Sequence, residues 1–129
     1  MVYIINRMFE IEMEPEVVTW LDTLTFAQYQ RVMRNVDDYL VDRGDMLDGD
    51  HTKALRDGVR ELRFHLEDTA WRITYWLPTG PGRLIVLLTV FQKVRNDAQP
   101  RDVERAVNAR RVCETSHTGP ADHVYERSE

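Results

Sequence analysis

The chain of 129 residues is 43% hydrophobic and 30% charged, which is ordinary for one globular domain and too apolar for wholesale disorder. The apolar run Leu84–Leu88 is too short to span a membrane, and we expect no signal peptide at the N-terminus. Cys113 is the only cysteine, which excludes an internal disulfide and fits a reducing compartment. We therefore expect a cytoplasmic protein.

The net charge of −5 argues against a nucleic-acid-binding protein, but the charges are unevenly distributed along the chain. Residues 51–113 carry 12 basic and 7 acidic side chains, whereas residues 1–50 carry 4 basic and 11 acidic ones. Residues 114–129 add 1 basic and 4 acidic side chains. The middle of the chain is thus a basic body with acidic flanks, which favours a phosphate-binding surface there. The alternative is that charge segregates by chance in so short a chain.

The first third of the chain predicts one strand and two helices. Residues 8–13 alternate apolar and acidic side chains, a pattern typical of a half-buried strand. Pro15, with a glutamate on each side, favours the start of a helix. Thr25 and Gln28 have the spacing of a capping box, which predicts the start of a second helix. We expect the two helices to form a hairpin, followed by a loop at Arg43–Asp50.

The rest of the chain predicts three strands and a last helix. Strands are expected at Gly58–Leu66, Thr69–Leu77 and Arg83–Phe91, with a short turn at Glu67-Asp68 and a turn rich in proline and glycine at residues 78–82. Tight turns between consecutive strands predict an antiparallel meander. Pro100 begins the helix, whose apolar side is expected to carry Val103, Ala106, Val107 and Val112.

The order β-α-α-β-β-β-α predicts an α+β fold in which the helices pack on one face of a small antiparallel sheet. The sheet would hold an N-terminal helical hairpin and a C-terminal helix. We expect the domain to span residues 8–114, with residues 1–7 as an N-terminal extension and residues 115–129 as a polar, flexible tail.

The strand at residues 58–66 places charged side chains on the face away from its apolar ones. Because side chains alternate across a strand, Glu61, Arg63 and His65 share one face. A turn at residues 67–68 would set Arg63 directly opposite Arg72. Like charges opposed in a sheet cost stability, and two guanidiniums kept there favour the binding of an anion such as phosphate.

Each of these residues also has a structural interpretation. Arg63 and Arg72 could pair with Glu61 and a nearby acid as a solvated ladder. His65 could be an ordinary surface histidine, and Lys93 a solubilising lysine at a strand end.

Other chemistry finds little support in the sequence. The histidines lack the close spacing of metal ligands, so we expect no metal site and no cofactor. Cys113 has no cluster of positive charge around it in sequence and is expected to be inert. Trp71, Tyr75 and Trp76 are expected to pack in the sheet rather than to stack on bases.

Five segments of the chain carry a resemblance to a known family. They are KALRDGVRELR at residues 53–63, WRITY at 71–75, LLTVFQK at 87–93, PEVVTWLDTL at 15–24 and VERA at 103–106. In this order and with this spacing they resemble the RelE/HigB toxin superfamily, in its phage-derived branch. The resemblance covers roughly residues 8–113, and it implies the same β-α-α-β-β-β-α fold.

The resemblance implies a toxin of a type II toxin–antitoxin system that enters the ribosomal A site and cleaves the mRNA there. Such toxins need no metal, because the ribose 2′-hydroxyl attacks the adjacent phosphate and leaves a cyclic phosphate and a 5′-hydroxyl. By motif position, Arg63 and Arg72 would stabilise the phosphate in the transition state, and Lys93 would act on the phosphate or the leaving group. His65 or Glu61 would be the general base, and histidine titrates near neutral pH.

Further residues and partners follow from the same resemblance. Lys53, Arg60 and Arg95 are the expected RNA-binding residues. The expected partner is an antitoxin with a helix-turn-helix DNA-binding domain. The chain departs from the family after Lys93, where a second lysine and a T-x-K-T-P run are common. Here the sequence is VRNDAQP, with Arg95 as a candidate substitute.

Two other functions fit the same fold. A ParE-like toxin would poison DNA gyrase without cleaving RNA, but Arg63, Arg72 and Lys93 favour the nuclease. A degenerate toxin would act only as a co-repressor with its antitoxin, which the acidic net charge and the altered segment after Lys93 would fit.

Overall fold

The structure is a computed structural model that describes residues 9–44, 46–78, 83–94 and 96–116. In chain order its elements are β1 (Glu10–Met13), α1 (Pro15–Asp22), α2 (Phe26–Val36), the π-helical turn η1 (Asp37–Val41), β2 (Thr52–Ala54), β3 (Arg60–Leu66), β4 (Thr69–Trp76), β5 (Leu84–Gln92) and α3 (Pro100–Ser116). The predicted extension at residues 1–7, the turn at 79–82 and the tail from residue 117 onward lie outside the described residues. Within the described ranges, no helix has the length and apolar character needed to cross a membrane.

The strands form one five-stranded sheet in the order β1-β5-β4-β3-β2. The predicted meander is confirmed, since β3, β4 and β5 pair antiparallel in sequence order. The prediction of a purely antiparallel sheet is wrong, because β1 pairs parallel to β5, with Glu10 opposite Leu84. The helical hairpin α1–α2 and the turn η1 connect β1, at one edge of the sheet, to β2 at the other edge.

A short strand that the sequence analysis missed closes the other edge of the sheet. β2 pairs antiparallel to β3, with Thr52 opposite Leu62 and Ala54 opposite Arg60. Three residues are too few to show an alternating pattern, which is why this strand has no signal in the sequence. The turn into β3 contains Gly58 at φ +78°, a conformation that glycine adopts without steric cost.

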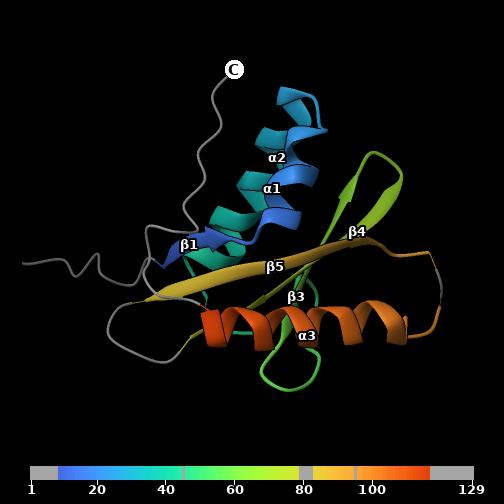
Figure 1. Ribbon diagram of the computed structural model, residues 1–129. Coiled ribbons are helices and arrows are strands. Elements are labelled where there is room, and N and C mark those ends of the chain that lie inside the picture. The colour runs from blue at the N-terminus through green and yellow to red at the C-terminus, as the bar shows by residue number, and fades with distance from the viewer. Residues whose placement is uncertain (1–8, 45, 79–82, 95, 117–129) are drawn as a thin grey trace, which may run out of the picture.

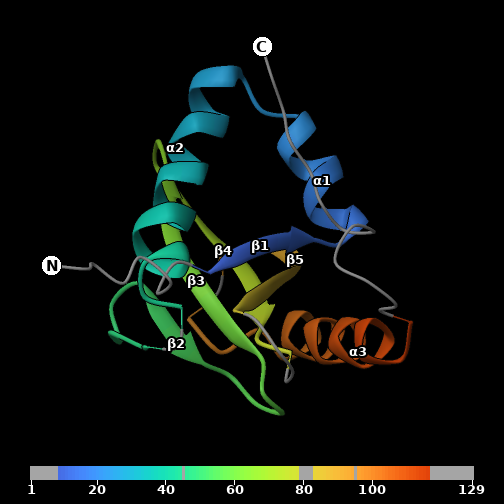
Figure 2. The same cartoon turned by 90° about the vertical axis from the view of Figure 1, so that its left-hand side faces the viewer.

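The helices cover both faces of the sheet, so the prediction that they share one face is wrong. Helices α1 and α2 lie on one side of the sheet and α3 lies on the other (Figure 1 and Figure 2). Two apolar cores result. Side chains of α1, α2 and η1 pack with Leu62, Phe64 and Ile73, whereas Ala106 and Val107 of α3 pack with the opposite face.

Helix α3 turns a slightly different side to the sheet than predicted. Ala106 and Val107 are buried as expected, but Val112 is 62% exposed and Cys113 is buried in its place. Positions 106, 110 and 113 follow the helical period, and Arg110 lies over the ring of Trp76. The helix also continues to Ser116, so the first two residues of the predicted tail are helical.

The predicted capping box at the start of α2 is confirmed. The Thr25 hydroxyl accepts the backbone N–H of Gln28 at 3.1 Å, and the Gln28 side-chain oxygen accepts the backbone N–H of Thr25 at 3.0 Å. Two backbone donors that the helix leaves without partners are thereby satisfied. This fixes where α2 begins, and α2 in turn packs on β3, which carries the predicted site residues.

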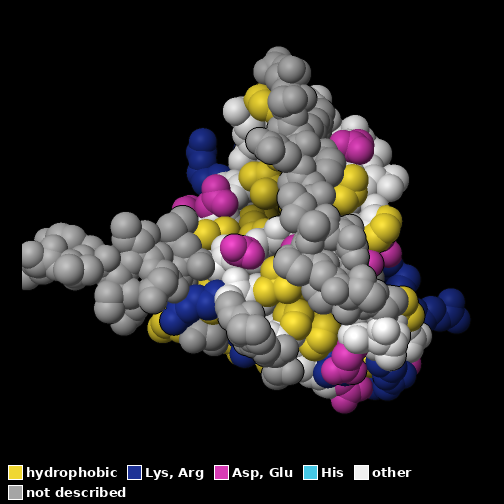
Figure 3. Space-filling view, turned by 60° about the vertical axis from the view of Figure 1, so that its left-hand side comes forward, with side chains coloured by type: hydrophobic (Ala, Val, Ile, Leu, Met, Phe, Trp, Pro, Cys, Tyr) yellow, Lys and Arg dark blue, Asp and Glu magenta, His cyan; other side chains and the backbone are white. Residues whose placement is uncertain are grey.

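Charge is not spread evenly over the surface. In the view of Figure 3, hydrophobic side chains gather near the middle of the described surface, acidic side chains lie both there and at the margins, and Lys and Arg side chains lie mainly at the margins. The described side chains in this view do not form a continuous basic surface, and the predicted site residues lie on β3 and β4.

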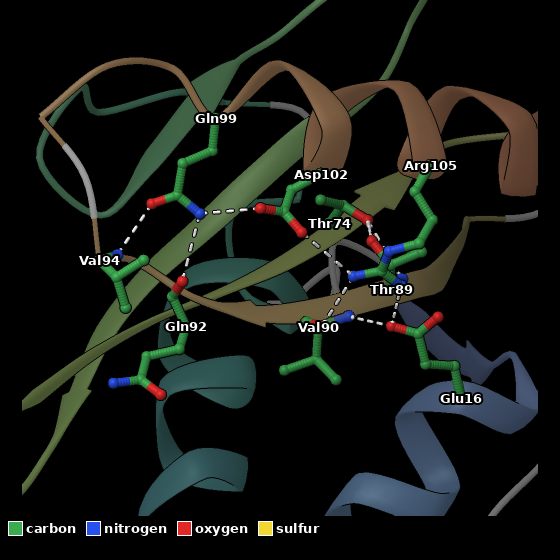
Figure 4. A network of polar contacts seen from close by, with 9 residues as sticks. All are labelled: Glu16, Thr74, Thr89, Val90, Gln92, Val94, Gln99, Asp102 and Arg105. Carbon is green, nitrogen blue, oxygen red and sulfur yellow. Dashed lines mark hydrogen bonds and ion pairs between the residues drawn. The ribbon is translucent and has the colours of Figure 1, made fainter.

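The outer edge of β5 beyond β1 is capped by side chains rather than by another strand (Figure 4). The Glu16 carboxylate accepts the backbone N–H of Val90 at 3.0 Å, and the Arg105 guanidinium donates to the Val90 carbonyl at 3.2 Å. Arg105 also contacts Glu16 directly and lies 3.6 Å from Asp102. Glu16 and Arg105 thus take the place of a strand partner at this edge of β5, which blocks pairing with another chain. Their contact with each other also links α1 to α3.

Candidate functional site

The centre of the candidate site is the predicted pair of opposed arginines. Arg63 of β3 lies opposite Arg72 of β4, which confirms the predicted register. The turn between the strands consists of Glu67, at φ +56°, and Asp68. Leu62, Phe64 and Leu66 point into the core, as predicted. The alternation of the strand therefore places Arg63 on the face away from α1 and α2.

A single carboxylate holds the two guanidiniums together. Glu61 is only 6% exposed, and its Oε2 lies 3.0 Å from Arg63 Nε and 3.8 Å from Arg72 Nε. Burial lowers the pKa of Arg72, Glu61 raises it again, and Arg63 lowers it further. The pairing with Glu61 that the structural interpretation expected is thus present. Glu61 is buried rather than solvated, however, and among the described ion pairs no second acid joins it, so one carboxylate faces two cations. The trio keeps a net positive charge.

The two arginines open onto a polar pocket with a volume of about 460 Å³. The residues that line it are Asn35, Asp50, His51, Arg63, Phe64, His65 and Arg72. The pocket combines two guanidiniums with two imidazoles, a set that can bind an anion and can also move a proton. His65, which the sequence singled out, is exposed and lies two residues beyond Arg63 on the same strand.

His51 is a pocket residue that the sequence analysis missed. Its backbone carbonyl accepts the N–H of Arg63 at 2.7 Å, and its ring stacks on Tyr39 with centroids 4.0 Å apart and an interplanar angle of 11°. Its Nδ1 lies 3.0 Å from Oδ2 of Asp48. The Asp48-Gly49 pair, which is typical of a turn, and a histidine three residues after the aspartate are the only signals for this arrangement in the sequence.

Asp48 organises the loop that carries His51. Its Oδ1 accepts the backbone N–H groups of Asp50, His51 and Thr52 at 2.9, 2.6 and 3.1 Å. The bond from the His51 N–H is the main reason why the pKa of Asp48 is lowered to about 2. Burial raises this pKa, and the bonds from the Thr52 N–H, the His51 ring and the Asp50 N–H lower it further. Asp48 therefore stays ionised at every physiological pH, and it holds His51 from both the backbone and the ring.

Lys93 lies at the same end of the meander as His65. Its backbone N–H donates to the carbonyl of Ala70 at 2.8 Å, and Ala70 lies opposite His65. The Lys93 ammonium contacts the backbone carbonyl of Asp97. It therefore holds the loop between β5 and α3, and it is not among the residues that line the pocket.

Gln99 organises this loop and ties it to the start of α3 (Figure 4). Although polar, it is buried, and its side-chain oxygen accepts the N–H of Val94 at 2.8 Å. Its side-chain nitrogen donates to the carbonyl of Gln92 at 3.2 Å and to Asp102 at 2.8 Å. Val94 and Gln99, which belong to the segment that departs from the expected family pattern, thus take part in a defined set of hydrogen bonds.

The three predicted RNA-binding residues do not gather in one place. Lys53 lies opposite Glu61, so it is on the face of Arg63, and it is exposed. Arg60 is on the opposite face and donates to the carbonyl of Gly44 at 3.2 Å. Arg95 lies outside the described residues.

Among the described residues, neither Cys113 nor the acidic side chains form a further reactive centre. Burial raises the pKa of the Cys113 thiol to about 11, so it stays protonated at physiological pH. Across the residues that the structure describes, no group of three His, Cys, Asp or Glu side chains is placed to hold a metal ion.

Comparison with protein families places the chain in a known family. The family of phage-derived Gp49-like proteins (DUF891) matches residues 19–111, which is well over half of the chain and includes every residue of the polar pocket. A search of curated proteins finds no match. On the strength of the family match, the chain belongs to the phage-derived Gp49-like family.

Proposed function

We propose that this protein is the toxin of a toxin–antitoxin pair and that it cleaves mRNA on the ribosome. The family to which the chain belongs is associated with the toxins of such systems. The observation that carries the nuclease assignment is the pocket in which Arg63 and Arg72 lie beside two histidines. The proposed partners are an antitoxin with a helix-turn-helix domain and the ribosomal A site.

The chemistry of the proposed reaction matches the groups in the pocket. Cleavage by the 2′-hydroxyl gathers negative charge on the non-bridging oxygens of the phosphate as the bond to the 5′-oxygen breaks. Two guanidiniums with fixed charge stabilise that oxyanion, each through N–H groups in a planar fork. Imidazoles suit the proton transfers, because histidine changes its charge near neutral pH.

Glu61 fits this reaction as the counter-ion of the arginines rather than as the general base. Its carboxylate is buried between Arg63 and Arg72 and accepts a hydrogen bond from Arg63. A base must reach the 2′-hydroxyl of a bound ribose, which the pocket histidines are better placed to do, since His65 is exposed and the side chain of His51 is 43% exposed. An incoming phosphate would share the guanidiniums with Glu61, since Arg63 retains 31% exposure of its side chain.

One observation favours the degenerate toxin instead. Glu61 already neutralises part of the charge of the arginine pair, and the Lys93 ammonium is engaged by a backbone carbonyl. A toxin that kept these contacts at all times would bind its antitoxin and repress transcription without cleaving RNA. This function predicts a folded chain that binds the antitoxin but does not arrest growth.

The test uses the purified chain, ribosomes programmed with a defined mRNA, and a gyrase supercoiling assay in parallel. We expect ribosome-dependent cleavage that disappears when the nucleotide before the cut carries a 2′-deoxyribose. We expect Arg72→Ala to slow cleavage by about 10²- to 10³-fold, the usual loss for an oxyanion-stabilising group. Arg56→Ala is the matched control, because it removes the same charge from an exposed ion pair with Glu104.

The outcomes separate the candidate functions. Loss of supercoiling with intact mRNA would overturn the nuclease in favour of the gyrase toxin. Intact mRNA together with normal supercoiling, in a chain that still binds its antitoxin, would favour the co-repressor. Cleavage that Arg72→Ala leaves at the wild-type rate would remove Arg72 from the reaction.

A further inference from the structure

The loop before β2 contains His51, and the contacts of its ring define which nitrogen carries the proton in the neutral form. His51 Nδ1 lies 3.0 Å from Oδ2 of Asp48, and a carboxylate can only accept a hydrogen bond. In the neutral imidazole, Nδ1 must therefore carry the proton and Nε2 must carry the lone pair. Stacking on Tyr39 at 4.0 Å fixes the plane of the ring. The structure thus preorganises His51 as a proton acceptor.

The position of His51 relative to the arginines is equally defined. Its carbonyl accepts the N–H of Arg63, and its side chain lines the same pocket as Arg63 and Arg72. His65, the other histidine of this pocket, lies two residues beyond Arg63 along β3, a separation of roughly 7 Å in a strand. In the register of the sheet, Arg63 therefore lies across from His51 and two residues before His65, so both imidazoles are its neighbours.

We propose that His51, oriented by Asp48, is the general base that accepts the 2′-hydroxyl proton, and this inference rests on the proposed function. Nε2 of His51 takes the proton as the 2′-oxygen forms its bond to phosphorus. The bond between phosphorus and the 5′-oxygen then breaks, and the imidazolium form of His65 gives its proton to that oxygen. The products are the 2′,3′-cyclic phosphate and the 5′-hydroxyl, and the cycle closes when His51 passes its extra proton through water to His65, which restores both imidazoles.

Asp48 is a positioning residue in this scheme, because it acts only through His51. An aspartate that holds the Nδ1–H tautomer also stabilises the imidazolium formed when Nε2 takes the proton. The competing interpretation is structural: the pair would merely close the loop between η1 and β2. The two interpretations differ in what happens when the base, or the tautomer alone, is changed.

The first arm of the test measures single-turnover cleavage on programmed ribosomes. We expect His51→Ala to slow cleavage by about 10²- to 10⁴-fold, the usual contribution of a general base, with ribosome binding unchanged. Added imidazole should restore part of the rate, which a purely structural histidine would not allow. A His51→Ala variant that cleaves at the wild-type rate, or a slow variant that imidazole does not rescue, would overturn the proposal.

The second arm changes only the tautomer and does not depend on activity. Asp48→Asn keeps an oxygen at the Oδ1 position for the three backbone N–H groups but places an amide donor at the Oδ2 position. We expect the ¹⁵N NMR signals of the His51 ring to report Nδ1–H in the wild type and Nε2–H in the variant, with cleavage slowed by about 10²-fold or more. Asp38→Asn removes the same charge from an exposed position on η1 and is the control.

Failure of the inference is distinguishable from failure of the proposed function. Cleavage by the wild type that is unaffected by His51→Ala leaves the nuclease intact and removes His51 from it. A wild-type chain that cleaves no mRNA overturns the proposed function, and the role of His51 falls with it. An Nε2–H signal in the wild-type chain would overturn the inference whether or not mRNA is cleaved.

Discussion

Replacing Glu61 by glutamine tests how the opposed arginines are held together. The substitution keeps the shape of the side chain and an oxygen that can accept the Arg63 Nε–H, but it removes the only carboxylate that contacts both guanidiniums among the described ion pairs. Arg63 and Arg72 then face each other across β3 and β4 without a shared counter-ion. We expect the fold to persist with reduced stability.

The magnitude follows from the distances to Glu61. Oε2 lies 3.0 Å from one Nε atom and 3.8 Å from the other, so the two Nε atoms are within about 7 Å of each other. At an effective dielectric constant of about 20, two unit charges at that distance repel by about 2 kcal/mol. Glu61 offsets this repulsion in the wild type, and Glu61→Gln leaves it uncompensated. For a domain of this size, a loss of that order lowers the melting temperature by about 8 °C.

The assay is urea denaturation and thermal unfolding of wild type and Glu61→Gln, each with and without inorganic phosphate. Phosphate should stabilise the variant more than the wild type, because it takes the place of the missing carboxylate and binds the folded state. Glu104→Gln is the control, since its partner Arg56 is half exposed and such surface pairs contribute at most about 1 kcal/mol. A Glu61→Gln variant as stable as the wild type, or one that phosphate does not favour, would refute this reasoning.

Three further predictions concern the fold. Thr25→Ala should lower the free energy of unfolding by about 1 kcal/mol in urea denaturation, because it removes the cap of α2, and Thr25→Ser should retain most of it. Glu16→Ala should expose the Val90 N–H at the edge of β5, so we expect faster amide exchange there and more concentration-dependent self-association by light scattering. Burial raises the pKa of Cys113 from 9.0 to about 11, so its contribution to stability is complete below about pH 9 and is lost as the pH rises toward 11. A thiol reagent at pH 8 should therefore label Cys113 only in unfolded protein, and rapid labelling of the native chain would contradict its burial.

The sequence predicted those features that depend on residues close together in the chain. A short turn fixes the register of a hairpin, so Arg63 could be placed opposite Arg72 from the sequence alone. The capping box at Thr25 likewise depends on residues three apart. The apolar stripe of α3 was visible in the sequence as well, although its rotation was not, since Val112 is exposed and Cys113 is buried.

Features decided by long-range packing could not be predicted in the same way. The pattern of residues 10–13 indicates a strand, but it does not say that β1 joins β5 in parallel. An apolar helix face does not say which side of a sheet it covers, so the sequence does not indicate that α3 packs on the face opposite α1 and α2. His51 belongs to a loop without any periodicity, and its neighbours Tyr39 and Arg63 come from distant elements. Only the fold brings this histidine into the pocket.

The central claim is that Arg63 and Arg72 together receive a phosphodiester, and NMR titration with an uncleavable RNA tests it most directly. The ligand is a short RNA with a 2′-deoxyribose at the cleavage position, added to chain labelled with ¹⁵N, and the signals are the arginine Nε–H groups. We predict saturable shifts of Arg63 and Arg72, with Arg56 unmoved. Shifts at Arg56 or other surface arginines while Arg63 and Arg72 remain unchanged would contradict the claim.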